Sequence, residues 1–300
     1  NDRDAADTAA EVQAIVDAYT DILAAADGTD ANTSGAAVPT QGDYQAIGVT
    51  GLSLTGAALL SDVIDGKQTA DVNTVAKVQA LANAVQAVLG YDDPVADAAS
   101  APTAAQINAL VAGQTVGGNT LGANAVSDDA LAAVRQAIDA ANSDGSAIAS
   151  QQELANVVQA ALDAYTSALS AISAAAEGNT ATASTPSAQT YADAGVTGVT
   201  ADNLAAINSA LSSGTPGDAA NVAGISGGEA NTAAEIQAIV NSYNAILAEA
   251  NDTHPTPGNN TADTTGYDPV VQDYVNIGAN IGDAATNTEK FALFSDIVAG

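Results

Sequence analysis

Apolar side chains recur at helical spacing in four matching stretches of thirteen residues. The stretches read EVQAIVDAYTDIL from Glu11, KVQALANAVQAVL from Lys77, VVQAALDAYTSAL from Val157 and EIQAIVNSYNAIL from Glu235. Their apolar positions follow the i, i+3, i+4, i+7 order that places side chains on one face of an α-helix. The pattern therefore predicts four amphipathic helices, each with an apolar stripe that needs a packing partner.

The first and fourth stretches superpose without gaps at their apolar positions. The stripe residues that we expect to be structural are Val12, Ile15, Val16 and Tyr19 in the first stretch and Ile236, Ile239, Val240 and Tyr243 in the fourth. We expect each stripe to be buried against a second helix of its own unit and against the adjoining unit.

A second phrase, with a glycine turn inside it, follows the stretches. It reads YQAIGVTGLSLTGAALLSDVIDG from Tyr44 and YADAGVTGVTADNLAAINSAL from Tyr191, and diverged or split copies follow the other two stretches. Glycine adopts positive φ without a Cβ clash. Gly48 and Gly195 are therefore predicted to end short helices, as structural turns before a second helix.

Polar residues mark the ends of the predicted helices. Thr8 with Glu11 three residues later has the pattern of a capping box. The first helix is predicted to begin at Thr8 and to stop before Gly28, a C-cap residue. Ser53 and Thr200 occupy matching places after the glycine turns, and we expect them to cap the second helices.

The spacing of the copies indicates tandem repeats. A glutamine shared by the four stretches stands at positions 13, 79, 159 and 237, so the copies lie 66, 80 and 78 residues apart. Copied supersecondary units stack on their neighbours. We therefore predict an all-α fold, a tandem array of about four small helical-bundle repeats with long polar loops. The predicted repeats are residues 1–66, 67–145, 146–227 and 228–300.

The two ends of the chain stand in the same phase of the repeat. Thirteen residues separate Gly66 from Gln79, and thirteen would separate Gly300 from Gln13 of another copy that followed directly. We expect either a window of a longer array or a subunit that joins head to tail. The expected partners are other copies of the chain or adjoining repeats.

The content of large apolar residues is low for four independent domains. Of the 300 residues, 60 are Val, Ile, Leu or Phe. Burying one such side chain contributes about 1.5–3 kcal/mol, whereas ordering the backbone costs about 1–2 kcal/mol per residue. A lone unit should therefore be marginal, and we expect the units to stabilise one another.

Charge excludes two classes of partner. The net charge is −30, from 35 acidic and five basic residues, so the surface repels nucleic acid phosphates and anionic membranes. No stretch approaches about 18 uninterrupted apolar residues, so we predict no membrane insertion. Cysteine is absent from the sequence, which excludes disulfides and thiolate chemistry.

Residues for catalysis are few. The single histidine, His254, has no serine or cysteine nucleophile context, and the chain carries no P-loop or HExxH motif. We predict no catalytic residues, no enzyme and no cofactor apart from a possible calcium ion, which prefers carboxylate and amide oxygens. The candidate calcium ligands, clustered after the first two predicted helices, are Asp27, Asp30, Asn32, Asp92 and Asp93.

Polar loops rich in Asn, Thr, Ser, Gly and Pro separate the helices. Variable loops on a fixed scaffold can carry recognition or glycans. The candidate glycosylation sites, which lie in Asn-x-Ser/Thr sequons of these loops, are Asn32, Asn251 and Asn259. A binding function would need exposed aromatic residues, for which Tyr91 and Tyr267 are the candidates.

The phrases EIQAIVNSYNAILAEAN, YADAGVTGVTADNLAAINSAL and ALLSDVIDGKQTADVNTVAKVQAL resemble repeats of giant, acidic, adhesin-like surface or secreted proteins of Gram-negative bacteria. The resemblance covers most of the chain and implies an extracellular or cell-surface location. The helix–turn–helix order is also similar to that of three-helix albumin-binding modules, from which the long loops depart.

We therefore predict a structural extracellular repeat protein that forms a stalk, or a self-assembling filament or surface layer, by head-to-tail packing of its repeats. The alternative is an adhesin module that binds a host protein or a carbohydrate through the long loops.

Overall fold

The computed structural model describes residues 6–28, 38–91, 100–143, 148–176, 185–212, 225, 229–250 and 269–299. The described residues are 67% helical, and the sheet found among them is a two-stranded hairpin. The prediction of a predominantly α-helical fold is therefore confirmed.

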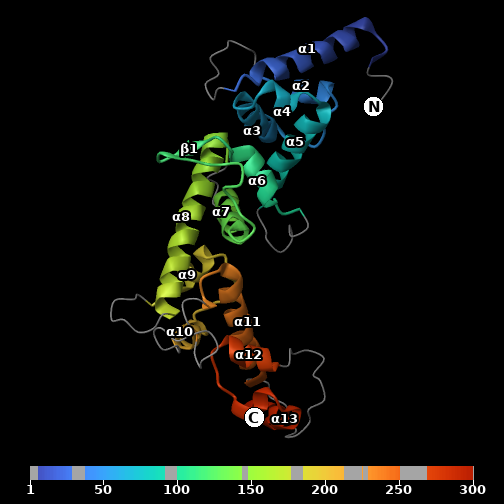
Figure 1. The fold of residues 1–300 in the computed structure, drawn as a ribbon. Helices are drawn as coiled ribbons and strands as arrows, with labels where there is room; N and C mark the ends of the chain where they lie inside the picture. The colour runs from blue at the N-terminus through green and yellow to red at the C-terminus, as the bar shows by residue number, and fades with distance from the viewer. Residues whose placement is uncertain are drawn as a thin grey trace. The chain divides into compact units, whose positions relative to one another are not determined.

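Figure 1 shows the order of the elements along the chain. The elements before residue 150 are α1 (Ala9–Ala25), α2 (Gln41–Ala46), α3 (Leu54–Asp65), α4 (Thr69–Val72), α5 (Val75–Leu89), α6 (Ala104–Val111), β1 (Thr115–Val116), β2 (Asn119–Thr120) and α7 (Leu131–Ser143). The later elements are α8 (Gln151–Ala176), α9 (Ala188–Asp193), α10 (Leu204–Leu211), α11 (Ala233–Ala250), α12 (Val271–Asn276), the 3₁₀ helix η3 (Gly282–Ala285) and α13 (Thr288–Ala299). Among the described helices, none combines the length and the apolar character that a bilayer crossing requires.

The chain forms two compact units. Unit 1 is Asn1–Leu162 and unit 2 is Asp163–Gly300, so the division falls within α8. The finer division into four repeats stays a prediction.

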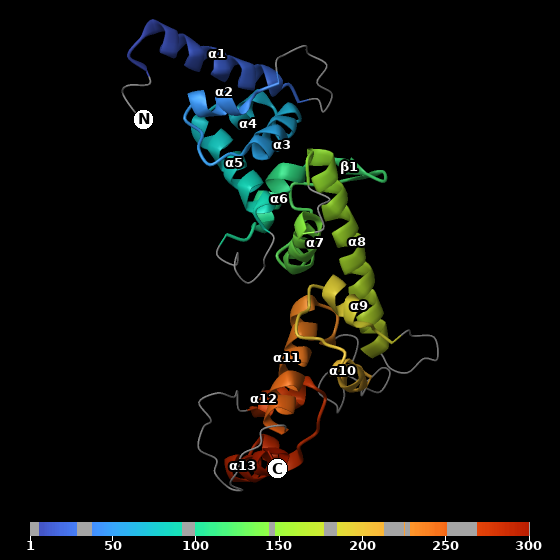
Figure 2. The ribbon, with the colours of Figure 1, turned by 180° about the vertical axis from the view of Figure 1, so that it is seen from behind.

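In unit 1, α1 lies across α2, α3 and α4, while α5 packs against α3, α4 and α6, as both views show (Figures 1 and 2). The face of α1 that packs here carries the buried residues Ala18, Ile22 and Ala25, whereas the predicted stripe residues Val12 and Val16 are exposed. The large side chains with the least exposure are Ile22, Tyr44, Leu59, Leu60, Ile64, Ile107, Leu110, Ile138, Ile148 and Leu154. One continuous core therefore runs from α1 to the first turns of α8.

In unit 2, α11 packs against three other described helices. It contacts α10, α12 and α13, and α13 also contacts η3. The core consists mainly of buried residues of α8, α9, α10 and α11, and includes Ile172, Tyr191, Ile207, Leu211, Ile236, Ile239 and Val240.

The two glycine turns form as predicted. Gly48 has φ 88° and Gly195 has φ 74°, a conformation in which a Cβ would be strained. In each turn the next residue folds back on the short helix. The N–H of Val49 donates to the carbonyl of Tyr44 at 2.9 Å, and Val196 donates to the carbonyl of Tyr191 at 2.9 Å.

The N-cap predictions are confirmed at two helices and wrong at a third, and the C-cap prediction at Gly28 is wrong, because α1 ends at Ala25 with Ala26 as its C-cap. Thr8 caps α1 in a capping box with Glu11, and the Ser53 hydroxyl caps α3. Thr200 does not cap α10, because the N-cap position is occupied by Asn203. The N–H of Thr200 donates to Asn203 Oδ1 at 2.7 Å, which forms a turn ahead of the helix.

A short hairpin interrupts the helical pattern between α6 and α7. Strands β1 and β2 pair antiparallel around Gly117 and Gly118, which have φ 56° and 89°. Two residues with positive φ match the right-handed twist of a two-residue hairpin turn. The sequence prediction contains no strand here.

Candidate functional site: a glutamine–turn junction

In unit 1 a glutamine on α5 binds the backbone of the glycine turn that follows α2. The N–H of Thr50 donates to Gln79 Oε1 at 2.9 Å, and Gln79 Nε2 donates to the carbonyl of Thr50 at 3.2 Å. Gln79 Nε2 also donates to Asn83 Oδ1, one helical turn later, at 2.8 Å. The asparagine thus orients the glutamine amide, which joins segments 29 residues apart.

Unit 2 contains the same arrangement at the matching positions. The N–H of Thr197 donates to Gln237 Oε1 at 2.8 Å, and Gln237 Nε2 donates to the carbonyl of Thr197 at 3.0 Å. Gln237 Nε2 also donates to Asn241 Oδ1 at 2.8 Å. We call this pairing of a helix glutamine with a turn backbone the glutamine–turn junction.

Apolar side chains lie on the same helix faces as the junction glutamines. Val78 and Ala82 of α5 are each 0% exposed, and Ile236 and Val240 of α11 are 1% and 0% exposed. These residues flank the glutamine at matching positions. Because each large apolar side chain contributes about 1.5–3 kcal/mol on burial and a hydrogen bond about 0.5–1.5 kcal/mol, the apolar contacts supply most of the stability. The directional hydrogen bonds fix the register.

In unit 2 a second asparagine strengthens the junction. Asn244 Nδ2 donates to the carbonyl of Gly198 at 3.0 Å, and Asn203 Nδ2 donates to Asn244 Oδ1 at 2.8 Å. Gly198 has φ 82°, and a Cβ there would lie 3.1 Å from Asn244 Nδ2 and 3.7 Å from Val240 Cγ1. The turn therefore approaches α11 so closely that a side chain at Gly198 would push it away.

Helix α1 has the same sequence pattern, but its junction face is uncovered. The expectation of a buried stripe does not hold for Val12 and Val16, which are 45% and 51% exposed. The physical reason is that no described segment covers this side of α1 as α3 covers α5. Gln13 Nε2 donates to Asp17 Oδ1 at 2.7 Å, and Gln13 Oε1 accepts no hydrogen bond from any described residue.

The other predicted stripe residues lie where the pattern places them. Ile15 and Tyr19 are partly buried, and the Tyr19 hydroxyl donates to the carbonyl of Asn73 at 2.5 Å. The stripe of α11 is buried at Ile236, Ile239 and Val240 and partly buried at Tyr243.

A buried tyrosine ties each short helix to the helix after the turn. In unit 1 the Tyr44 hydroxyl lies 2.8 Å from Ser61 Oγ, which donates to the carbonyl of Pro39 at 2.5 Å. Since Ser61 has one proton to give, Tyr44 is the donor of the first bond. Burial raises the pKa of the Tyr44 hydroxyl well above its ordinary value.

Unit 2 has an equivalent network. The Tyr191 hydroxyl donates to Asn208 Oδ1 at 2.8 Å, and Asn208 Nδ2 donates to the carbonyl of Pro186 at 2.9 Å. Burial also raises the pKa of Tyr191. In both networks 17 residues separate the tyrosine from its partner.

The last copy of the phrase does not form this network. The Tyr274 hydroxyl is buried and has no hydrogen-bond partner among the described residues. The ring meets Phe291 and Phe294 edge-on, at centroid distances of 6.0 and 4.9 Å. Burial, followed by the nearby Glu249 and Asp273 carboxylates, raises the pKa of Tyr274.

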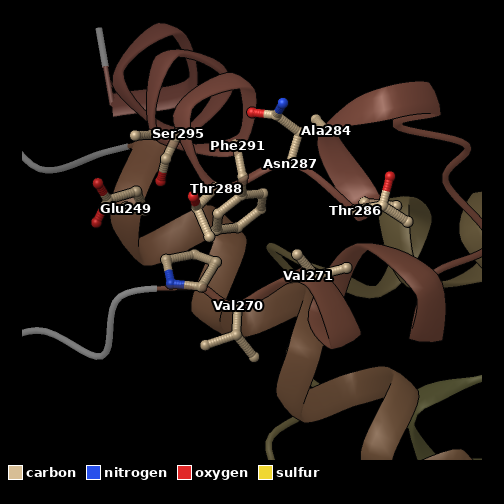
Figure 3. Close-up of a pocket in the computed structure, with 12 residues that line it drawn as sticks. Glu249, Val270, Val271, Ala284, Thr286, Asn287, Thr288, Phe291 and Ser295 are labelled. Atoms are coloured by element: carbon tan, nitrogen blue, oxygen red, sulfur yellow. The ribbon is translucent and has the colours of Figure 1, made fainter.

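A cavity of about 450 Å³ lies beside this cluster (Figure 3). Pro269, Ser295, Phe291 and Glu249 are among its lining residues. Pro269 and Ser295 match Pro39 and Ser61, which bond directly in unit 1. The cavity is therefore lined by the two residues whose counterparts in unit 1, Ser61 and Pro39, are hydrogen-bonded to each other.

Most candidate calcium and glycosylation residues lie outside the described part of the chain. Asp27 follows α1, where it forms an isolated β-bridge with Gln68. The candidates outside the described residues are Asp30, Asn32, Asp92, Asp93, Asn251 and Asn259. Among described residues, no group of three or more acidic or histidine side chains is placed to hold a metal ion.

The prediction that Tyr91 is an exposed recognition residue is wrong. Its side chain is 6% exposed, because it packs in the core of unit 1, and its carbonyl accepts a hydrogen bond from Asn142 Nδ2 at 2.9 Å. Tyr267, the other candidate, lies outside the described residues.

The residue pairs of the junction and of the tyrosine networks are not part of the sequence prediction. Their signal is the glutamine shared by the stretches and the 17-residue spacing after Tyr44 and after Tyr191. Comparisons of the chain with protein-family models, with curated proteins and with solved structures found no match.

Proposed function

We propose that the chain is a structural protein, a tandem array of four helical-bundle repeats held in register by glutamine–turn junctions. The observation that carries the proposal is the occurrence of the same junction, with matching residues and distances, at Gln79 and at Gln237. In both cases the glutamine belongs to one predicted repeat and the turn belongs to the repeat before it. The contact is therefore a link between successive repeats.

Burial supports the same conclusion. The stripe of α5 is covered where α5 meets α3 of the preceding predicted repeat, whereas Val12 and Val16 of α1 have no such cover. In stacked repeat proteins, each repeat generally needs a neighbour to cover its apolar face. Stability then depends on coupling between neighbours.

The surface suits a long extracellular scaffold. A net charge of −30 keeps such a chain soluble and separate from anionic polymers. The resemblance to giant acidic surface proteins of Gram-negative bacteria motivates an extracellular or cell-surface location. We propose that the array serves as a stalk or as the subunit of a filament or surface layer.

Glutamine replacement tests the proposal. Gln79→Ala removes both bonds to Thr50 and should destabilise the chain by about 1–3 kcal/mol, at about 0.5–1.5 kcal/mol per hydrogen bond. Gln189→Ala is the matched control, since Gln189 is an exposed helix glutamine whose side chain bonds Asp193 Oδ1 at 2.8 Å. That i, i+4 pair is worth about 0.2–0.5 kcal/mol.

The readout is urea unfolding followed by circular dichroism. In an array, weakening a junction uncouples neighbours, so Gln79→Ala should broaden or split the unfolding transition. Equal curves for Gln79→Ala and Gln189→Ala would contradict the proposed junction. Negative-stain images of the native material should show threads of uniform width, and isolated compact particles would contradict the scaffold role.

A further inference from the structure

We propose that the uncovered face of α1 binds the glycine turn and the α13 face of a second copy of this chain, which completes a glutamine–turn junction between molecules. The inference rests on the proposed function, because it extends the internal junction to a contact between copies. Each half of the contact lies within one compact unit.

The turn after α12 repeats the geometry of the two turns that a glutamine binds. Gly278 has φ 74°, and the N–H of Ala279 donates to the carbonyl of Tyr274 at 2.9 Å. Asn280 thus stands where Thr50 and Thr197 stand. Asn280 is exposed, and its backbone N–H and carbonyl bond to no described residue. This turn offers the donor and the acceptor that a junction glutamine requires.

The apolar face beside this turn is also uncovered. Leu293 and Ile297 of α13 match Leu59 and Val63 of α3 in the shared phrase. Leu293 and Ile297 are 63% and 70% exposed, whereas Leu59 and Val63 are each 0% exposed. Helix α3 packs against α1, α2 and the following α5, while α13 packs against α11 and η3. Among the described elements, α13 therefore lacks a counterpart of α5.

Helix α1 supplies the features that α5 supplies in the internal junction. Val12 and Val16 match the fully buried Val78 and Ala82. Gln13 is already held by Asp17 as Gln79 is held by Asn83. Its Oε1 accepts no bond from a described residue. The two uncovered faces of the chain are therefore the two complementary halves of one contact.

The occupant is a second copy because the two uncovered faces reproduce the two unlike halves of the internal junction. A contact between unlike patches is heterologous, so it produces rings or open chains and not only symmetric dimers. The net charge of −30 on each copy opposes association, and salt screens that repulsion. Assembly should therefore increase with both protein concentration and ionic strength.

Sedimentation velocity of the 300-residue chain, at rising concentration and at low and high NaCl, tests the inference. The wild type should form dimers and larger species. Val16→Asp and Leu293→Asp should each remain monomeric, since each places a carboxylate in one half of the contact. Both sites are exposed in the free chain, so circular dichroism should show unchanged helix content.

Mixing the two variants gives the sharpest result. Val16→Asp keeps an intact α13 half and Leu293→Asp keeps an intact α1 half, so an equimolar mixture should form 1:1 dimers and no larger species. Val38→Asp is the matched control, because Val38 is 54% exposed and lies before α2. This variant should assemble as the wild type does.

Three outcomes would overturn the inference: a wild-type chain that stays monomeric at every concentration and salt, a Val38→Asp variant that also fails to assemble, or a mixture that stays monomeric. None of them bears on the glutamine–turn junctions within the chain, which fail separately if Gln79→Ala unfolds as Gln189→Ala does.

Discussion

Replacing Tyr44 by phenylalanine removes one hydroxyl from the core of unit 1 and keeps the ring. Tyr44 is 0% exposed and its partner Ser61 is 3% exposed, so water cannot replace the lost donor. A buried hydrogen bond of this kind contributes about 0.5–1.5 kcal/mol. Ser61 Oγ retains its bond to the carbonyl of Pro39, so no buried donor is left unsatisfied. We expect Tyr44→Phe to destabilise the chain by about 1 kcal/mol.

The last copy of the phrase supplies the matched comparison. The Tyr274 hydroxyl is buried without a partner among the described residues, so Tyr274→Phe removes a desolvated group and no hydrogen bond. Its expected effect is neutral or slightly stabilising.

Urea unfolding followed by circular dichroism measures both variants. With a urea dependence of about 1–3 kcal/mol per molar, the Tyr44→Phe midpoint should fall by about 0.3–1 M, and that of Tyr274→Phe should not fall. Equal losses from the two variants would refute the assigned role of the Tyr44 hydroxyl bond.

Two further predictions concern pH and backbone conformation. Burial raises the folded-state pKa of Tyr44 and Tyr191 above the ordinary value of about 10. The contribution of the two buried hydroxyls to the free energy of unfolding is therefore complete below about pH 10 and is lost as the pH rises above it. Urea midpoints should therefore fall above pH 10, and less steeply in Tyr44→Phe, whereas a flat profile would contradict tyrosine burial. Gly198→Ala should cost more than Gly51→Ala. Both glycines have φ 82°, a strain of about 1–2 kcal/mol for alanine, but only the Cβ at Gly198 meets a neighbour, Asn244 Nδ2 at 3.1 Å. Thermal unfolding compares the two variants. Equal decreases in melting temperature would show that the Asn244 side chain moves aside at no cost.

Helix formation could be predicted from the sequence, but coverage of the helices could not. The same spacing places Val12 on α1 and Ile236 on α11, and both helices form. Spacing decides which side chains share a face. Whether that face is covered depends on a segment elsewhere in the chain. Val12 is therefore 45% exposed, whereas Ile236 is 1% exposed.

Local sterics predict a backbone conformation reliably where only one residue type can adopt it. Only glycine adopts positive φ at little cost, so Gly48 and Gly195 were predictable. The cap of α10 was not, because Thr200 and Asn203 are both good capping residues and the Asn203 side chain bonds the Thr200 N–H. The turn of the hairpin was within reach, since a Gly117–Gly118 pair is a two-residue turn signal, but Asn119 on its far side is not typical of a strand.

The candidate site was partly visible as a constant glutamine inside an apolar stripe. An alanine-rich stripe alone sets register weakly, because small side chains present a nearly featureless surface. A glutamine that bonds a backbone N–H and a carbonyl accepts only one placement of the facing turn. Because the glutamine bonds only backbone atoms of the turn, the turn residue can be Thr50, Thr197 or, in the proposed contact between copies, Asn280. The side chain of the turn residue takes no part in these two backbone bonds, at Gln79 or at Gln237.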